Sequence, residues 1–145
     1  MIRFTTIDDP PHDLQETLWN HLRDSSNKAL GVPSLEENRF FAITAEQDGA
    51  LIGGALGLIY FRGLNLQCLW VHEAHRGSDL GTEFLLRVEN EARASQCTVI
   101  YGHTFGFQAP GFYLKQGYEV FGEIPDFPAG HTCFFLRKIL TQTVR

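Results

Sequence analysis

Alternating apolar and polar positions at the start of the chain predict a strand followed by a helix. Residues 2–7 alternate between the two classes and end at a run of aspartate and proline, as a short strand does before a turn. Leucine and tryptophan then recur at helical spacing up to Gly31, a residue type that commonly ends a helix. A strand and an amphipathic helix are therefore expected in this order.

The middle of the chain predicts an antiparallel meander. Asp48 and Gly49 separate two β-rich runs and form a dipeptide typical of a two-residue hairpin turn. A second turn is expected at residues 62–65, where arginine, glycine and asparagine interrupt the apolar pattern. The strands of the meander are predicted at residues 39–46, 51–61 and 66–71.

The rest of the chain predicts two helices and further strands. After a glycine-containing turn at residues 76–81, apolar positions fall on one helix face and charged positions on the other. A short helix at residues 109–116 ends at Gly117, the preferred residue just past a helix. The strands are expected at residues 98–105, 118–124 and 132–140. The order β-α-β-β-β-α-β-α-β-β predicts an α/β fold with one parallel crossover, between the fourth and fifth strands.

Size and charge indicate one domain, residues 1–145, without a membrane span or a nucleic-acid partner. No apolar run reaches the roughly 18 residues that a span needs, and the N-terminus lacks a signal-peptide pattern, so a cytoplasmic protein is expected. The net charge of −5 and the scattered basic residues argue against nucleic acid, because phosphate backbones attract clustered lysine and arginine. An acidic chain favours a cationic small molecule or peptide.

The cysteines do not suggest a metal site. Cys68, Cys97 and Cys133 are widely spaced and form none of the close pairs that bind zinc or act as a redox dithiol. They are expected to be reduced, mostly buried thiols, and no metal cofactor is expected.

The turn at residues 76–81 is a candidate phosphate site. A strand that enters a helix through a glycine-containing turn directs free backbone amides and the positive end of the helix dipole at one point. An ordinary strand-to-helix turn is the alternative. A nucleotide-hydrolysing P-loop and a dinucleotide fingerprint are disfavoured, because neither Gly-Lys-Ser/Thr nor G-x-G-x-x-G is present.

Two motifs resemble the Gcn5-related N-acetyltransferase (GNAT) family. Residues 69–86, LWVHEAHRGSDLGTEFLL, resemble its central motif, and residues 109–118, APGFYLKQGY, resemble its downstream helix motif. The predicted order of elements is also similar along nearly the whole chain. The resemblance implies a mixed, mostly antiparallel twisted sheet with flanking helices and with splayed fourth and fifth strands.

The resemblance also implies how acetyl-CoA is bound. Backbone amides of the turn and of the helix start would bind the pyrophosphate, and two strand residues would pair with the pantetheine arm. The implied cofactor-binding residues are Leu69, Val71, Arg76, Gly77, Ser78, Asp79, Gly81 and Thr82.

The sequence departs from the family pattern at two positions. Asp79 replaces a glycine, which puts a carboxylate beside an anion site; aspartate tolerates left-handed geometry and can also cap the helix amides in competition with phosphate. Gly106 stands where the family often has asparagine, and Gln108 is a candidate to supply the missing cofactor contact.

The matched helix motif implies a catalytic acid. Tyr113 matches the family tyrosine that lies near the sulfur and protonates the departing thiolate, and the Val71 amide would polarise the thioester carbonyl. The general base stays open, because Asn65 stands where some members carry glutamate. The candidates are ordered water, which ranks first, and the side chains of His103, His72, Glu36 and Glu37.

The expected activity is direct transfer of an acetyl group from acetyl-CoA to a primary amine of a small molecule or peptide. Asp126 and Phe127 lie in a loop that, in family members, often lines the acceptor pocket or forms a dimer contact. They are candidates to hold a cationic amine, and a solvent-exposed hairpin is the alternative. Family habit favours a homodimer. Another acyl-CoA reaction is one rival, and the other is a CoA-sensing or dimeric binding module that has lost catalysis.

Overall fold

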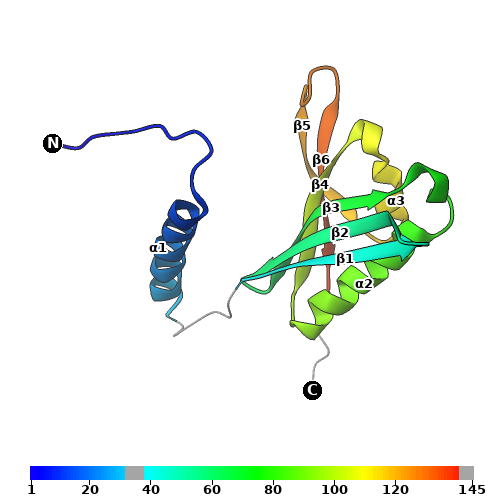
Figure 1. Ribbon diagram of the computed structural model, residues 1–145, viewed down its shortest axis with the longest axis horizontal. Helices are drawn as coiled ribbons and strands as arrows, with labels where there is room; N and C mark the ends of the chain where they lie inside the picture. Colours follow the sequence, from blue (N-terminus) through cyan, green and yellow to red (C-terminus); the bar gives the residue numbers. More distant parts are fainter. Residues whose placement is uncertain (32–37, 141–145) are drawn as a thin grey trace. The chain divides into compact units, whose positions relative to one another are not determined.

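The computed structural model describes residues 1–31 and 38–140. The chain falls into two compact units, Met1–Glu37 and Asn38–Arg145 (Figure 1). In the described part of the first unit the regular element is the helix α1 (His12–Leu30), and the second unit contains a six-stranded sheet with its own helices. The prediction of one domain over residues 1–145 stays a prediction.

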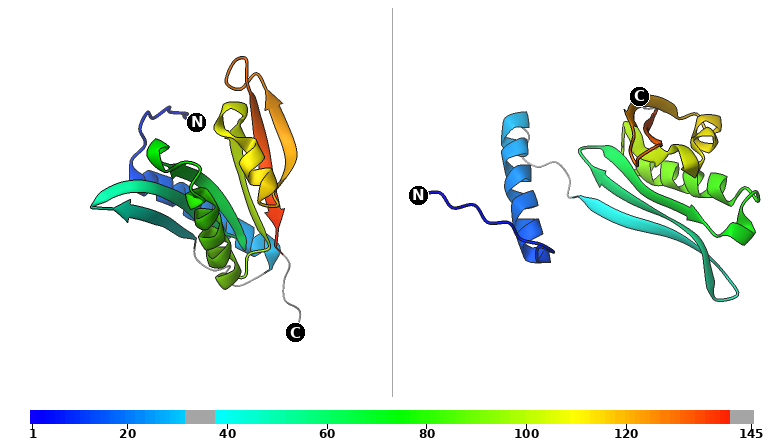
Figure 2. Two further views of the ribbon diagram at one scale, coloured as in Figure 1. Left: turned by 90° about the vertical axis from the view of Figure 1, so that its right-hand side faces the viewer. Right: turned by 90° about the horizontal axis from the view of Figure 1, so that it is seen from above.

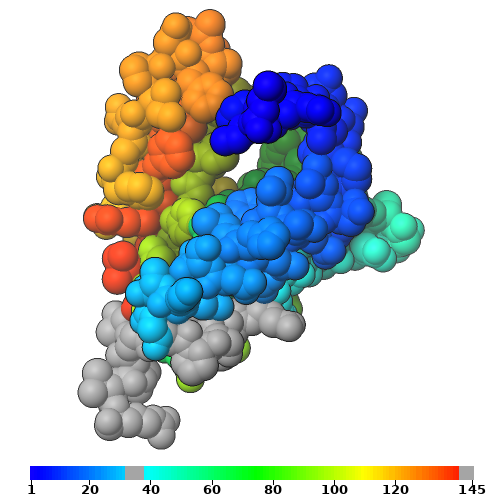
Figure 3. Space-filling model, turned by 90° about the vertical axis from the view of Figure 1, so that its left-hand side faces the viewer, coloured from blue at the N-terminus to red at the C-terminus, as the bar shows by residue number. Residues whose placement is uncertain are grey.

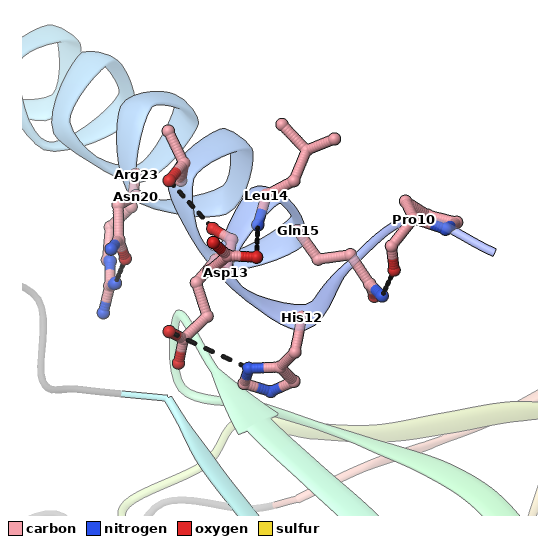
Figure 4. A network of polar contacts seen from close by, with 9 residues as sticks. Pro10, His12, Asp13, Leu14, Gln15, Asn20 and Arg23 are labelled. Carbon is pink, nitrogen blue, oxygen red and sulfur yellow. Dashed lines mark hydrogen bonds and ion pairs between the residues drawn. The ribbon is translucent and has the colours of Figure 1, made fainter. Parts of the chain in front are cut away.

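The first helix ends where the sequence predicts. At its start, Asp13 Oδ1 accepts a hydrogen bond from the Leu14 amide at 3.0 Å, and Gln15 Nε2 donates to the Pro10 carbonyl oxygen at 2.8 Å (Figure 4). At its end, Gly31 adopts φ 67° and donates its amide to the Lys28 carbonyl oxygen at 3.3 Å. The C-terminal cap therefore uses the left-handed conformation that glycine adopts most readily.

The predicted first strand, residues 2–7, is wrong. The structure gives this segment no strand, and its apolar side chains are exposed. An alternating pattern forms a strand only where a neighbouring strand completes the backbone hydrogen bonds. The segment has no ladder partner among the described residues, so its pattern does not become a strand.

The sheet has the predicted mixed, mostly antiparallel topology. Its spatial order is β1-β2-β3-β4-β6-β5, and β3 and β4 form the parallel pair. The strands are β1 (Arg39–Gln47), β2 (Ala50–Tyr60), β3 (Gly63–Val71), β4 (Val99–Phe105), β5 (Glu119–Pro125) and β6 (Thr132–Ile139). The helices of this unit are η1 (Glu73–His75), α2 (Leu80–Ala94), η2 (Gly106–Gln108) and α3 (Pro110–Lys115).

One of the two predicted hairpin turns is shifted. Asp48 and Gly49 form a two-residue turn with φ 52° and 80°, as predicted. The second turn uses Phe61 and Arg62, with φ 50° and 59°, because Gly63 already pairs with Tyr60. Glycine and asparagine at residues 63–65 suggested a turn, but these residues begin β3.

The core lies between the sheet and α2, which covers one face (Figures 1 and 2). Phe84, Leu85 and Val88 on the helix pack with Leu64 and Ile100 on the central strands, and all five are at most 2% exposed. Cys97 and Cys133 are buried as expected, whereas the prediction is wrong for Cys68, which is exposed. None of these three cysteines belongs to a disulfide in the structure.

The parallel strands part soon after they meet. Only residues 63–65 of β3 pair with β4, at residues 99–101, and the strands then separate toward their carboxyl ends (Figure 2). At the point of separation, a Cβ atom added to Gly102 would lie 2.6 Å from the Leu66 carbonyl oxygen. Glycine is therefore required for β4 to pass the β3 backbone this closely.

Gly102→Ala is expected to destabilise the fold by about 1–3 kcal/mol, because the added methyl overlaps a backbone oxygen that cannot rotate away. Urea unfolding would measure the loss. Gly111→Ala in α3 is the matched control, since no atom lies within 4 Å of its added Cβ. Equal stability of the two variants would contradict this account of the strand separation.

Candidate functional site

The turn that follows β3 is fastened to the end of its own strand. Arg76 Nε donates to the Val71 carbonyl oxygen at 3.2 Å, and Ser78 Oγ donates to the carbonyl of His75. Gly77 and Asp79 both take the left-handed conformation, with φ 81° and 63°. These contacts shape residues 76–82, which we call the anion cradle.

The cradle presents unused backbone amides at the start of α2. The Glu83 amide donates to the Asp79 carbonyl oxygen at 3.0 Å and begins the helical ladder. The amides of Leu80, Gly81 and Thr82 precede this bond, so they lack partners within the helix. Together with the positive end of the helix dipole, they suit an anionic group such as a phosphate.

The Asp79 side chain does not cap the helix. Its backbone adopts the left-handed geometry that the sequence analysis expects to be tolerated, but its carboxylate accepts no capping hydrogen bond. The predicted competition through capping is therefore wrong. What remains is a negative charge next to the amides that suit an anion.

Helix α3 is fastened to the cradle. A Cβ atom added to Gly81 would lie 3.1 Å from the Phe112 ring, so this glycine allows α3 to pack against the start of α2. Gln116 Nε2 donates to Thr82 Oγ1 at 3.2 Å. The segment that carries Tyr113 is thus held against the cradle by both packing and a hydrogen bond.

A largely buried ion pair completes this attachment. Lys138 Nζ, on β6, donates to Glu89 Oε1 of α2 at 2.9 Å and to the Gln116 carbonyl oxygen at 3.0 Å. The side chains of Lys138 and Glu89 are only 25% and 12% exposed. The pair joins α2, the end of α3 and the sheet, and an ion pair this buried holds only if both partners are present.

The edge of β3 beyond the separation presents the backbone of Leu69 and Val71. The His72 amide donates a hydrogen bond to the carbonyl oxygen of Ile52, on β2, at 2.7 Å. Because successive amides along a strand point in opposite directions, the Val71 and Leu69 amides point away from β2, toward the gap beside β4. An extended chain placed in the gap can pair with these amides as a further strand would.

A cleft lies where β3 and β4 part. It encloses about 240 Å³, part of it open to solvent, and is lined by Leu66, Tyr101, Gly102, His103, Tyr113, Tyr118 and Leu136. Burial, with a smaller contribution from the nearby Cys68, raises the pKa of Tyr113 from 10.0 to about 12. Its phenol therefore carries its proton throughout the neutral range.

Tyr118 brings a second phenol to the cleft. Its ring meets that of Tyr113 edge-on, with the centroids 5.8 Å apart. Its hydroxyl is buried and makes no hydrogen bond in the structure. The pKa of Tyr118 is raised above its ordinary value, mainly by burial, so this phenol also stays protonated at neutral pH.

The candidate bases differ in their positions and hydrogen bonds. His103 lines the cleft. His72 Nδ1 accepts the Ala74 amide at 3.1 Å, so the neutral ring carries its proton on Nε2 and has no free lone pair to act as a base. Glu36 and Glu37 lie outside the described residues.

Gln108 is used within its own turn. Its Oε1 accepts the Phe105 amide at 3.2 Å, which closes η2 at the end of β4. The predicted cofactor contact of Gln108 stays a prediction.

Sequence reasoning missed the residues that act through packing. Gly102 interrupts a strand pattern, a signal that indicates a close backbone approach. Lys138 falls at an inward position between Leu136 and Leu140, which predicts a buried charge in need of a partner. That its partner is Glu89 could not be read from the sequence, because the two residues lie on separate elements.

Two features are absent from residues 1–31 and 38–140, the part of the chain that the structure describes. No group of three or more His, Cys, Asp or Glu side chains within them is placed to hold a metal ion. None of the helices within them is long and apolar enough to cross a membrane.

The mixed sheet with parted central strands, and between them in the chain a helix whose first amides lack intrahelical partners, define an α/β fold with a site suited to an anion. A family profile described as "Acetyltransferase (GNAT) family" matches residues 4–118. The chain belongs to this family, and it is an acetyl-CoA-dependent acetyltransferase.

Individual relatives agree with this assignment. Blasticidin-S acetyltransferase of Streptomyces morookaense is 40% identical over 93 residues, which cover 63% of this chain and 68% of that protein. The crystal structure of an acetyltransferase from Bacillus cereus ATCC 14579 has a TM-score of 0.80 and 29% identity, covering 94% of this chain and 98% of that one. An aminoglycoside 6'-N-acetyltransferase complexed with coenzyme A shares the fold, with a TM-score of 0.65, 18% identity, and coverage of 97% and 98%.

Removing the charge of Asp79 is expected to strengthen CoA binding. Asp79→Asn should lower the dissociation constant by about two- to fivefold, since a like charge several ångströms from a phosphate costs roughly 0.5–1 kcal/mol. Asp79→Gly should lower it further, because glycine adopts φ near 63° without steric cost.

Calorimetric titration with CoA would measure both constants. Asp48→Asn is the matched control, because Asp48 has a similar φ of 52° but lies in the hairpin between β1 and β2. Unchanged or weaker binding in both Asp79 variants would refute the idea that this carboxylate opposes the cofactor.

Proposed function

We propose that this acetyltransferase moves an acetyl group directly from acetyl-CoA to a primary amine of a small molecule, with Tyr113 as the catalytic acid. The observation that carries the proposal is the position of Tyr113 in the cleft where β3 and β4 part, and the raised pKa of its phenol agrees with the role of an acid. Tyr113 is fastened to the anion cradle through α3, so one cofactor can reach both.

Backbone geometry supports the proposed cofactor-binding residues. The free amides at the start of α2 bind the pyrophosphate, and the cradle residues that shape them are Arg76, Gly77, Ser78, Asp79, Gly81 and Thr82. The backbone of Leu69 and Val71 pairs with the pantetheine arm along the open edge of β3. This path leads from the cradle to the cleft.

The proposed reaction needs no covalent enzyme intermediate. The neutral amine attacks the thioester carbonyl carbon while the Val71 amide donates a hydrogen bond to the carbonyl oxygen. A carbon–nitrogen bond forms and the carbon–sulfur bond breaks, so that the electron pair of the latter leaves on sulfur. The Tyr113 phenol gives its proton to this thiolate. One proton of the acceptor nitrogen passes to water, the base that ranks first, and His103, which lines the cleft, is the alternative base. A proton from water returns to the Tyr113 phenolate and restores the acid for the next turnover.

The substrate class follows from relatives and charge. A relative 40% identical is named for blasticidin S, and the net charge of −5 favours a cationic acceptor. Residence in the cytoplasm and assembly as a homodimer are further parts of the proposal. If the protein binds CoA but acetylates no amine, the proposed function is wrong.

Tyr113→Phe is expected to lower kcat by about 10²-fold, because general-acid catalysis by a positioned side chain contributes on this order. The KM for acetyl-CoA should change little, since the variant keeps the ring that packs beside Phe112 and Tyr118. Release of free thiol from acetyl-CoA in the presence of a panel of amines would measure both constants.

Tyr118→Phe is the matched control in the same cleft. Its hydroxyl makes no hydrogen bond, so its removal should leave kcat within about twofold and should not reduce stability. Equal losses of kcat in the two variants would contradict a specific role for the Tyr113 proton.

The pH profile provides a separate test. As the pH rises, kcat should increase because the acceptor amine loses its proton. Because the pKa of Tyr113 is about 12, kcat should show no decrease at any pH up to about 10. A falling limb between pH 7 and 9 that disappears in Tyr113→Phe would show that the phenol titrates much lower. The contribution of this burial to stability is complete below pH 10 and is lost as the pH rises through 12.

A further inference from the structure

Aromatic side chains gather on the face of β4 that points away from α2. Ile100 is fully buried against α2, and side chains alternate along a strand, so Tyr101, His103 and Phe105 lie on the opposite face. Across the ladder, Phe135 of β6 contacts His103, with ring centroids 5.8 Å apart. This face of the sheet is therefore lined with rings.

Two phenylalanines beyond the end of β4 extend these rings. Phe107 of η2 stacks on Phe105 with an interplanar angle of 4° and centroids 5.5 Å apart. Phe127, from the loop between β5 and β6, meets Phe105 edge-on at 5.4 Å. We call Phe105, Phe107 and Phe127 the aromatic shelf.

The shelf is organised but still exposed. His131 packs edge-on against Phe107 at 5.0 Å, and Asp126 Oδ1 accepts the Gly130 amide at 2.8 Å, which closes the hairpin loop. Nevertheless 58% of Phe107 and 46% of Phe127 remain exposed. The hairpin that carries Phe127 is seen in orange to red in Figure 3. Rings already held in place lose little conformational freedom when a ligand covers them.

His103 connects the shelf to the reaction site. His103 lines the cleft together with Tyr113, and its ring contacts that of Phe105, with the centroids 5.7 Å apart. The cleft is lined from both faces of β4, since Gly102 lies on the α2 face and His103 on the opposite one. An acceptor whose amine lies in the cleft can therefore extend over the shelf without crossing the cradle.

We propose that the aromatic shelf is the acceptor subsite and binds a planar aromatic or heteroaromatic ring carried by the amine substrate. The proposal rests on the function proposed above, because the acceptor amine is what brings the ring to the cleft. A planar ring offers the face and edge that aromatic pairs require, whereas a saturated ring of the same size offers only apolar surface.

The charge next to the shelf fits such a substrate. Asp126 directly precedes Phe127 in the hairpin loop. An amine reaches the enzyme mainly as an ammonium ion, which this carboxylate and the faces of the rings attract. The shelf thus recognises the ring while the surrounding charge favours the cationic form in which the amine arrives.

Two amines with the same carbon skeleton test the proposal: 2-phenylethylamine and 2-cyclohexylethylamine. The full-length enzyme should acetylate the planar amine with a kcat/KM about tenfold higher. Phe107→Leu and Phe127→Leu keep an apolar side chain but remove its π face, so each should bring this ratio toward one. The KM for acetyl-CoA should stay unchanged in both.

Phe61→Leu is the matched control. Phe61 is as exposed as Phe127, at 46%, but lies in the turn before β3, at the other end of the sheet. It should keep the wild-type ratio, and thermal melts should show that all variants are folded.

A wild-type ratio near one overturns the shelf as a ring site while leaving the acetyltransferase function intact. Equal losses for both amines in the shelf variants also overturn it. So does a variant that changes the oligomeric state in sedimentation without changing the ratio, because the shelf would then be a subunit interface. Acetylation of no amine by a protein that binds CoA overturns both proposals.

Discussion

The structure depends on one constraint, the separation of two parallel strands that begin as neighbours. β3 and β4 pair over residues 63–65 and 99–101 and then diverge. Gly102 sets the place, because only a residue without a Cβ can pass the Leu66 carbonyl oxygen at this distance. The separation leaves backbone amides of β3 unpaired and opens the cleft, so the features needed for cofactor binding and for catalysis have one geometric origin.

The second organising feature is the attachment of α3 to α2. The Phe112 ring packs against Gly81, and Gln116 donates to Thr82, so the start of α2 is joined to the helix that bears Tyr113. Lys138 reinforces this attachment from the sheet through Glu89. In the proposed reaction, an anion bound by the cradle and a thioester beside Tyr113 belong to one molecule. A rigid link between their binding elements therefore fixes the distance that this molecule must span.

The sequence predicts elements whose signals are local. The end of α1 at Gly31, the Asp48-Gly49 turn and the helix that follows the cradle depend on neighbours in the chain, and the structure confirms them. Residues 2–7 show the limit of such signals, because alternation describes a strand but cannot supply the partner it needs.

The candidate site likewise has residues that local sequence patterns predict and residues that they do not. The cradle could be found from its spacing, and Tyr113 from its motif. The strand separation at Gly102 and the pair of Lys138 with Glu89 join residues far apart in the chain. Asp79 is an intermediate case: its left-handed backbone was predictable from the residue type, but the absence of a capping bond depends on where the turn directs its carboxylate.

Strand β4 separates two chemically different surfaces, and this separation bears on how two substrates can meet. Its α2 face carries Gly102 and Thr104, next to the helix whose first amides suit an anion. Its opposite face carries His103 and Phe105, next to exposed rings. In the proposed reaction the polyanionic cofactor and the amine therefore approach from different sides of the sheet. They share only the gap where the strands have parted, so neither substrate has to leave for the other to bind, and direct transfer needs no acyl-enzyme stage.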